Sequence, residues 1–225
     1  MKTLVIGDTH GCLEELQALL KKAKPDLNRE RLVMLGDYID RGPQSYELIQ
    51  YLQKLQLNYG KEKVVLLRGN HEQMAIDHFE HADPNCWSNG FGETMNSFAR
   101  HQADIKEAFR FFKSLPLYFE DEQFIYVHAG LRPGLELKKQ PSHALLWSRE
   151  EFISSTFDFG KTVIFGHTVT RSLTGNDVPV RRGNKVALDT ACVYGGRLSA
   201  LAIENGMITR LCQVPGWNRH SKKIA

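Results

Sequence analysis

The chain has 225 residues, a length that fits a single domain of medium size. Hydrophobic residues make up 42% of the sequence, which is ordinary for a globular protein and enough to form a core. Charged residues make up 24% and their signs nearly cancel, so the net charge is +3 at pH 7. This balance argues against a nucleic-acid-binding protein, which needs a clustered basic face, and we expect no nucleic-acid partner.

The sequence also carries no sign of a membrane protein or of a disulfide framework. The apolar run Leu4–Ile6 is much shorter than a signal peptide or a membrane span, and no other stretch approaches a span. The four cysteines, Cys12, Cys86, Cys192 and Cys212, lie far apart and form no CxxC pair. We therefore expect reduced thiols, a cytoplasmic location and no membrane partner.

In the first seventy residues, short aliphatic runs end in polar clusters and alternate with helical patterns. The runs are Thr3–Ile6, Arg31–Leu35 and Lys63–Leu67. Apolar residues recur at helical spacing over Leu13–Ala23 and Leu48–Leu55. Strands that alternate with helices predict a βαβ core with parallel strands.

The rest of the chain changes character. Residues 79–98 contain Asp-Pro and Asn-Gly pairs and are predicted as a long loop, of the kind that often shapes a substrate cleft. Helix is expected from about Gln102 to Ser114, and strand patterns follow. The later strands are predicted at Leu117–Glu120, Phe124–His128, Thr162–Phe165, Lys185–Leu188, Leu198–Glu204 and Met207–Val214. We expect one domain over residues 1–216 and a polar, flexible tail over residues 217–225.

Five short motifs each follow a predicted strand directly. They are Gly7–Gly11 (GDTHG), Gly36–Gly42 (GDYIDRG), Arg68–Glu72 (RGNHE), Val127–Gly130 (VHAG) and Phe165–Thr168 (FGHT). In open α/β sheets, ligands bind beyond the carboxyl ends of the strands. Five distant segments are therefore expected to deliver side chains to one place.

Those side chains form a set of metal ligands. The set consists of the carboxylates of Asp8 and Asp37, the imidazoles of His10, His128 and His167, and the amide oxygen of Asn70. Mixed nitrogen and oxygen ligands without a thiolate suit Mn²⁺, Fe or Zn²⁺. Six ligands are too many for one ion that leaves room for a substrate, so we expect two ions bridged by one carboxylate.

The neighbouring residues suit phosphate chemistry. Two divalent ions outweigh the charge of two aspartates, so a net positive site remains for a phosphate dianion. Arg41 lies beside the ligands and can bind phosphate oxygens bidentately. A hydroxide that bridges the two metals would attack phosphorus in line. His71 is the candidate general acid for the leaving group, and Asp40 the carboxylate that orients it.

The motifs resemble the phosphoprotein phosphatase family of serine/threonine phosphatases, within the calcineurin-like metallophosphoesterase superfamily. The family signature GDxHG, GDxxDRG and GNHE is complete here, and the resemblance extends from Asp8 to at least Arg197. It implies an α/β fold, an αββα sandwich of two mixed β-sheets flanked by helices. Residues 1–216 would then be the metallophosphoesterase catalytic domain.

The resemblance also implies a role for each motif residue. Asp8, His10 and Asp37 would hold the first metal, with Asp37 as the bridge, and Asn70, His128 and His167 would complete the second. The metals would be Mn²⁺, with Fe or Zn²⁺ as alternatives. Arg41 and Arg149 would bind phosphate, His71 and Asp40 would form the acid pair, and Tyr194 would lie on a loop that contacts substrate.

Among related activities, a serine/threonine protein phosphatase is the preferred interpretation. Nucleases and cyclic-nucleotide phosphodiesterases usually end in GHxH, whereas Val169 stands at the second histidine position here and leaves a metal position open. The alternative is a symmetrical diadenosine tetraphosphate hydrolase, whose second and third motifs typically depart from DRG and GNHE. The substrate would thus be a phosphorylated protein or peptide, or else a nucleotide polyphosphate. A binding module without turnover is disfavoured, because such a protein is expected to have lost ligands or the acid pair. Here all six ligands, His71 and Asp40 are present.

Overall fold

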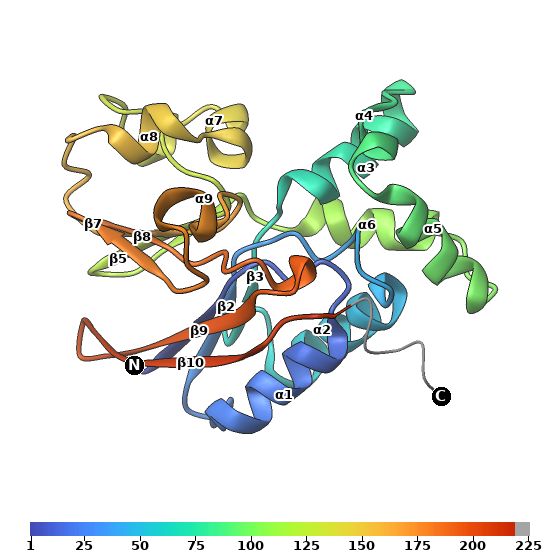
Figure 1. The fold of residues 1–225 in the computed structure, drawn as a ribbon, viewed down its shortest axis with the longest axis horizontal. Helices are drawn as coiled ribbons and strands as arrows, with labels where there is room; N and C mark the ends of the chain where they lie inside the picture. Colours follow the sequence, from blue (N-terminus) through green and yellow to red (C-terminus); the bar gives the residue numbers. More distant parts are fainter. Residues whose placement is uncertain (219–225) are drawn as a thin grey trace.

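The computed structural model describes residues 1–218, and the remainder of the expected tail, residues 219–225, lies outside the described part. Two five-stranded sheets pack face to face, and helices cover their outer faces (Figure 1). Each sheet mixes parallel and antiparallel neighbours. This arrangement confirms the expected αββα sandwich.

The first sheet contains the N-terminal strands and the C-terminal hairpin. Its order is β10-β9-β1-β2-β3, with β1 at Thr3–Ile6, β2 at Arg31–Met34, β3 at Val64–Leu66, β9 at Arg197–Glu204 and β10 at Met207–Pro215. The strands β1, β2 and β3 are parallel, as the alternating strand–helix pattern predicts. Strand β9 runs antiparallel to both β1 and β10.

The second sheet comes from the middle of the chain. Its order is β4-β5-β6-β8-β7, with β4 at Tyr118–Glu120, β5 at Phe124–Val127, β6 at Thr162–Phe165, β7 at Val180–Arg182 and β8 at Lys185–Ala187. The strands β5, β6 and β8 are parallel. The sequence analysis missed β7, because this short edge strand reads Val-Arg-Arg and offers no alternating apolar pattern.

The helices fall into groups that cover different parts of the sandwich (Figure 1). The helices α1 and α2 pack on the outer face of the first sheet, and α7 and α8 on the outer face of the second. The helices α3–α6 form a group beside α2 and share its hydrophobic core. Their bounds are α1 Leu13–Ala23, α2 Ser45–Tyr59, α3 Asn70–His81, α4 Asn85–Ser88, α5 Phe91–Arg100, α6 Lys106–Ser114, α7 Ser142–Trp147, α8 Glu150–Ser154 and α9 Thr170–Thr174, with 3₁₀ turns at Leu137–Lys139 and Cys192–Tyr194.

The period-2 alternation of the strands divides the core into layers. In β1, Leu4 and Ile6 face the core shared with α1 and α2, whereas Val5 faces the core between the sheets. In β5, Tyr126 lies between the sheets and Val127 packs with the α7–α8 layer. Strands buried on both faces read as continuous apolar runs, and this explains their clear signal in the sequence.

The prediction of a long loop over residues 79–98 is wrong. Helix α3 extends to His81, and α4 and α5 occupy most of the rest. The turn-forming pairs mark short breaks between these helices, with Gly90 in a left-handed conformation at the start of α5. Phe91, Thr94 and Phe98 on α5 are buried, so tertiary packing supports a helix that turn propensity argued against.

Trp217, at the start of the expected tail, contacts the folded domain. Its backbone N–H donates to the carbonyl oxygen of Cys192 at 2.9 Å, and its half-buried ring packs against the core. Within residues 1–218, no helix is both long enough and apolar enough to span a membrane.

The loops after β2 and β3 pack so closely that Gly69 admits no side chain. A methyl group on Gly69 would lie 2.3 Å from the backbone nitrogen of Asp37 and 2.1 Å from its Oδ1 atom. We expect Gly69→Ala to lower the free energy of unfolding by about 1–3 kcal/mol, the usual cost of overpacking. Denaturant titration with a chelator present measures this without any contribution from metal.

The matched control is Gly92→Ala, because Gly92 lies within α5 and an added methyl group would meet no atom within 4 Å. Alanine favours helix over glycine, so this variant should gain about 0.5–1 kcal/mol. Wild-type stability of Gly69→Ala would contradict the close approach of the two loops.

Candidate dimetal centre

The motif residues converge where the carboxyl ends of the parallel strands of both sheets meet. Asp8 and His10 follow β1, Asp37 follows β2, and Asn70 is the first residue of α3 after β3. From the second sheet, His128 follows β5 and His167 follows β6. All six side chains are buried, the most exposed being His167 at 8%. The sandwich thus delivers the predicted ligands to one buried site.

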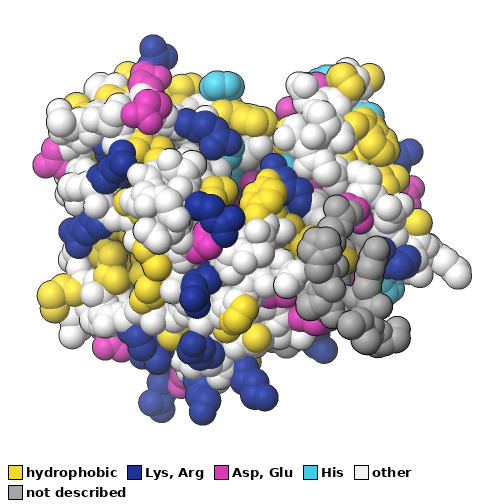
Figure 2. All heavy atoms as spheres, in the orientation of Figure 1, with side chains coloured by type: hydrophobic (Ala, Val, Ile, Leu, Met, Phe, Trp, Pro, Cys, Tyr) yellow, Lys and Arg dark blue, Asp and Glu magenta, His cyan; other side chains and the backbone are white. Residues whose placement is uncertain are grey.

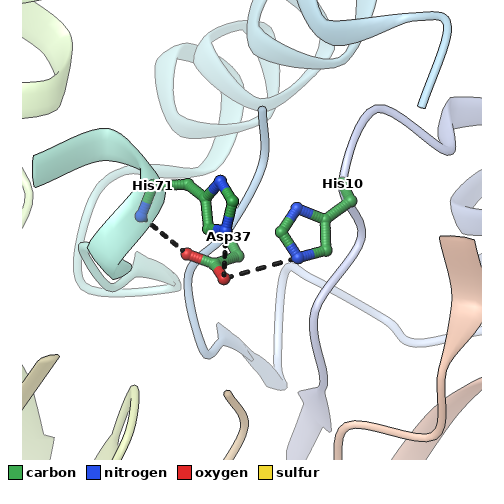
Figure 3. Close-up of side chains that lie close together, drawn as sticks. All are labelled: His10, Asp37 and His71. Carbon is green, nitrogen blue, oxygen red and sulfur yellow. Dashed lines mark hydrogen bonds and ion pairs between the residues drawn. The ribbon is translucent and has the colours of Figure 1, made fainter. Parts of the chain in front are cut away.

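The carboxylate of Asp37 lies at the middle of this site. Its Oδ2 atom is 3.4 Å from His10 Nε2 and 3.9 Å from His71 Nε2 (Figure 3). Its Oδ1 atom is 3.5 Å from His128 Nε2. Two groups of side chains that could each hold a metal ion share Asp37, one with His10 and His71 and the other with His128 and His167. A shared carboxylate is the arrangement that a bridging ligand requires.

The second group brings hydrogen-bond acceptors together. His128 Nδ1 donates to the carbonyl oxygen of Leu35 at 2.9 Å, so its Nε2 atom carries the lone pair when the ring is neutral. That Nε2 atom lies 2.8 Å from Asn70 Oδ1, and His167 Nδ1 lies 2.9 Å from the same oxygen. Two imidazole nitrogens and an amide oxygen that converge on one point are a ligand set that fits a divalent cation there.

Other buried atoms lead to the same conclusion. Asp8 Oδ1 and His167 Nε2 have no hydrogen-bond partner among the described residues. His10 Nδ1 donates to the carbonyl oxygen of Ile39 at 2.8 Å, and its Nε2 atom accepts from the cationic Arg41 at 2.5 Å. These nitrogen and oxygen atoms form a donor set that suits divalent cations.

The electrostatics keep the histidines neutral, as metal ligation requires. Burial lowers the pKa of His10 and of His128, and burial together with His128 lowers the pKa of His167 to about 2. Asp37 Oδ1 accepts a hydrogen bond from the backbone N–H of His71 at 3.1 Å, and this bond favours the ionised carboxylate. The site therefore presents neutral imidazoles around an ionised carboxylate.

The ligand loops adopt backbone conformations that are costly for residues other than glycine. His10, Asp37, Asp40, Arg41 and His167 all have φ between 45° and 72°. Such conformations persist only when the surroundings enforce them, and they concentrate at functional sites.

The carboxylate of Glu72 supplies much of that enforcement. It accepts hydrogen bonds from the backbone N–H groups of Asp37 (3.0 Å), Tyr38 (2.8 Å) and Gly69 (2.9 Å). The sequence analysis gave Glu72 no role, although the residue completes the GNHE motif. Its function is to join the loops after β2 and β3.

Beside the ligands, His71 and Asp40 form a buried pair. His71 Nδ1 lies 2.6 Å from Asp40 Oδ2. Thr94, from α5, donates to Asp40 Oδ1 at 2.6 Å and accepts from the Asp40 backbone N–H at 2.8 Å. Thr94 could not be found from the sequence, because it lies in the segment that was predicted as a loop.

The remaining predicted residues also lie at the site. Arg149 Nη1 is 3.4 Å from both the His167 carbonyl oxygen and Thr168 Oγ1. The Arg41 guanidinium carbon is 5.5 Å from the centre of the half-exposed Tyr194 ring. Arg41, Tyr194 and Trp217 line a cavity of about 530 Å³. Figure 2 shows the surface hollowed between the α7–α8 and α3–α5 sides of the molecule.

Comparisons with known proteins agree with this geometry. The chain is 30% identical over 213 residues to serine/threonine-protein phosphatase 1 of Salmonella typhimurium, covering 89% of this chain and 91% of that protein. It is 32% identical over 141 residues to a symmetrical bis(5'-nucleosyl)-tetraphosphatase of Pseudomonas fluorescens, covering 62% of this chain but only 45% of that relative. A crystal structure of a putative diadenosine tetraphosphatase shares the fold, with a TM-score of 0.70 at 23% identity over 96% of this chain and 94% of that one.

The family assignment rests on most of the chain. Residues 1–194 match the family described as calcineurin-like phosphoesterase, and this range contains every predicted ligand. Members of this family are hydrolases that use two divalent metals, and the described histidine and aspartate groups are able to bind them. The chain belongs to the calcineurin-like phosphoesterase family.

Proposed function

We propose that the chain is a serine/threonine protein phosphatase. The observation that carries this proposal is the buried His71–Asp40 pair, which lies against Asp37 at the centre of the ligand set. The pair belongs to the complete GDxxDRG and GNHE motifs of phosphoprotein phosphatases. The match to the Salmonella phosphatase over 91% of its length supports the same choice.

In this proposal, the six ligands form two groups that share one carboxylate. Asp8, His10 and Asp37 hold the first divalent cation, and Asn70, His128 and His167 join Asp37 around the second. Mn²⁺ is the proposed metal, with Fe or Zn²⁺ as alternatives that accept the same ligands. When bound, the two cations supply a hydroxide nucleophile at neutral pH and attract the phosphoryl oxygens.

The protein side chains position the phosphate and supply the proton. Arg41 and Arg149 bind the phosphoryl oxygens, because guanidinium groups pair bidentately with phosphate. His71 donates a proton to the leaving oxygen of serine or threonine, since an alkoxide is a poor leaving group. Asp40 stabilises the protonated imidazole and fixes its orientation through Nδ1.

Tyr194 and the cavity beside Arg41 provide room for the group next to the phosphate. The ring of Tyr194 is 53% exposed and stands beside the proposed phosphate-binding arginine. We propose that the peptide segment next to the phosphorylated residue contacts this ring.

The second candidate is a symmetrical diadenosine tetraphosphatase. The 32% identity to such an enzyme favours it, although the chain spans less than half of that relative. An exposed aromatic ring beside a phosphate-binding arginine also suits a stacked nucleobase. A binding module without turnover finds less support, because every predicted ligand and the acid pair come together in the site.

The two activities differ in substrate and product. With Mn²⁺ added, kcat/KM for a phosphothreonine peptide should exceed that for diadenosine tetraphosphate by at least about tenfold, a difference of ~1.4 kcal/mol in transition-state binding. Phosphate release and nucleotide chromatography measure the two reactions. A preference for the nucleotide would replace the proposed function with the second candidate.

The proposed role of His71 predicts an effect that depends on the leaving group. His71→Asn should lower kcat on a phosphopeptide by roughly 10²–10⁴-fold, the usual contribution of a general acid. The loss should be smaller for p-nitrophenyl phosphate, whose leaving group needs little protonation. Metal content should stay the same, and loss of metal would instead make His71 a ligand.

His78→Asn is the matched control, because His78 lies on the same helix but away from the site. Within the described residues, its ring forms one hydrogen bond, to the carbonyl oxygen of Asp83. Its kcat should equal that of the wild type on both substrates.

Thr94 should act through Asp40. Thr94→Val removes a hydroxyl that donates to the carboxylate, and we expect kcat on a phosphopeptide to fall roughly tenfold to hundredfold, in line with a charge-assisted hydrogen bond. Thr94→Ser keeps the hydroxyl and should restore most of kcat. Metal content should stay constant in both variants.

Ser97→Ala is the control for Thr94, because Ser97 lies on the same helix and makes equivalent bonds to Glu47 and the Tyr46 backbone. It should lower stability without changing kcat, and an equal loss of kcat in this variant would mean that α5 acts only through the fold.

A further inference from the structure

A third carboxylate, that of Asp189, is buried at the edge of the metal-ligand set. Asp189 follows β8 and is 6% exposed. Its carbonyl oxygen accepts from the backbone N–H of Thr170 at 2.8 Å. This bond attaches Asp189 to the first residue of α9, three residues after the candidate ligand His167.

The two carboxylate oxygens of Asp189 have different surroundings. Oδ1 accepts a hydrogen bond from the backbone N–H of Ala191 at 3.0 Å, which supports the left-handed turn there. No group within residues 1–218 donates a hydrogen bond to Oδ2 in the structure. One oxygen therefore has a structural partner, and the other is available to a ligand.

The charges around Asp189 are those of the proposed metal site. Asp189 lies against the loop that carries Asp8, because a methyl group on Gly7 would lie 2.5 Å from the Leu188 carbonyl oxygen and 3.5 Å from the Asp189 backbone nitrogen. There the carboxylate of Asp189 interacts with those of Asp8 and Asp37 and with the guanidinium groups of Arg41 and Arg149. Three carboxylates buried together repel one another, and Asp8 Oδ1 is itself without a partner among the described groups. Such a cluster is costly unless a cation compensates it.

We propose that Asp189 is a positioning residue of the metal centre, which uses its free oxygen to increase the affinity for the divalent cation on the Asp8 side. This inference rests on the proposed ligand roles of Asp8, His10 and Asp37. Asp189 supplies a third negative charge beside those of Asp8 and Asp37. It acts from outside the six ligands, so its effect is on the affinity of the site for metal.

Asp189→Asn isolates the charge, because asparagine has nearly the same size and keeps an oxygen for the Ala191 N–H. Calorimetric titration of chelator-treated protein with Mn²⁺ should show two bound ions in the wild type. In the variant, the Kd of one ion should rise about 10–100-fold, the usual effect of removing a group that supports a metal site. The melting temperature of the metal-free variant should equal or exceed that of the wild type, because repulsion from Asp8 and Asp37 is relieved.

Asp104→Asn is the matched control, since Asp104 Oδ1 accepts from the backbone N–H two residues later in the same way but at the exposed start of α6. Its Mn²⁺ affinity should be unchanged. Asp189→Ser, which also keeps an oxygen near the Ala191 N–H, should repeat the loss of affinity and guards against misfolding of the first variant.

The possible outcomes separate this inference from the proposed function. Unchanged Mn²⁺ affinity in both Asp189 variants would overturn the role of Asp189 and leave the phosphatase proposal standing. Weaker binding together with a lower melting temperature of the metal-free variants would also overturn it, because Asp189 would then only support the loop. A wild-type protein that binds no divalent metal would overturn the proposed function itself.

Discussion

The arrangement of the site depends on one buried carboxylate, that of Asp37. It lies within 4 Å of three imidazoles, those of His10, His71 and His128. An ionised carboxylate that is 2% exposed is stable only where polar partners and cations replace the lost water. Two groups of side chains that could each hold a metal ion share this residue, so a shift of Asp37 would affect both groups.

The scaffold also holds the backbone of Asp37 in place. Glu72 accepts the backbone N–H groups of Asp37 and of Gly69, and the absence of a side chain at Gly69 lets the two loops touch. These contacts hold Asp37 in its left-handed conformation, which would otherwise be unfavourable. The unfavourable backbone conformation of Asp37 therefore occurs where several loops constrain it at once.

The buried His71–Asp40 pair depends on a different part of the fold. Thr94 on α5 holds both the backbone and the carboxylate of Asp40, which in turn contacts His71. Helix α5 thus holds one member of the His71–Asp40 pair, whereas most of the predicted ligands directly follow the ends of strands.

The sequence alone was enough to predict most strands, the helix Leu13–Ala23, the sandwich and the convergence of six candidate ligands from distant motifs. Strand periodicity is local, and each ligand lies within a short motif whose residue types already indicate its chemistry. Only the tertiary structure revealed α4 and α5, the role of Glu72 for Asp37 35 residues away, and that of Thr94 for Asp40 54 residues away. The surroundings of the two Asp189 oxygens could likewise be found only from the tertiary structure. Hydrogen bonds between distant segments depend on how the elements pack, and no local pattern in the chain records that packing.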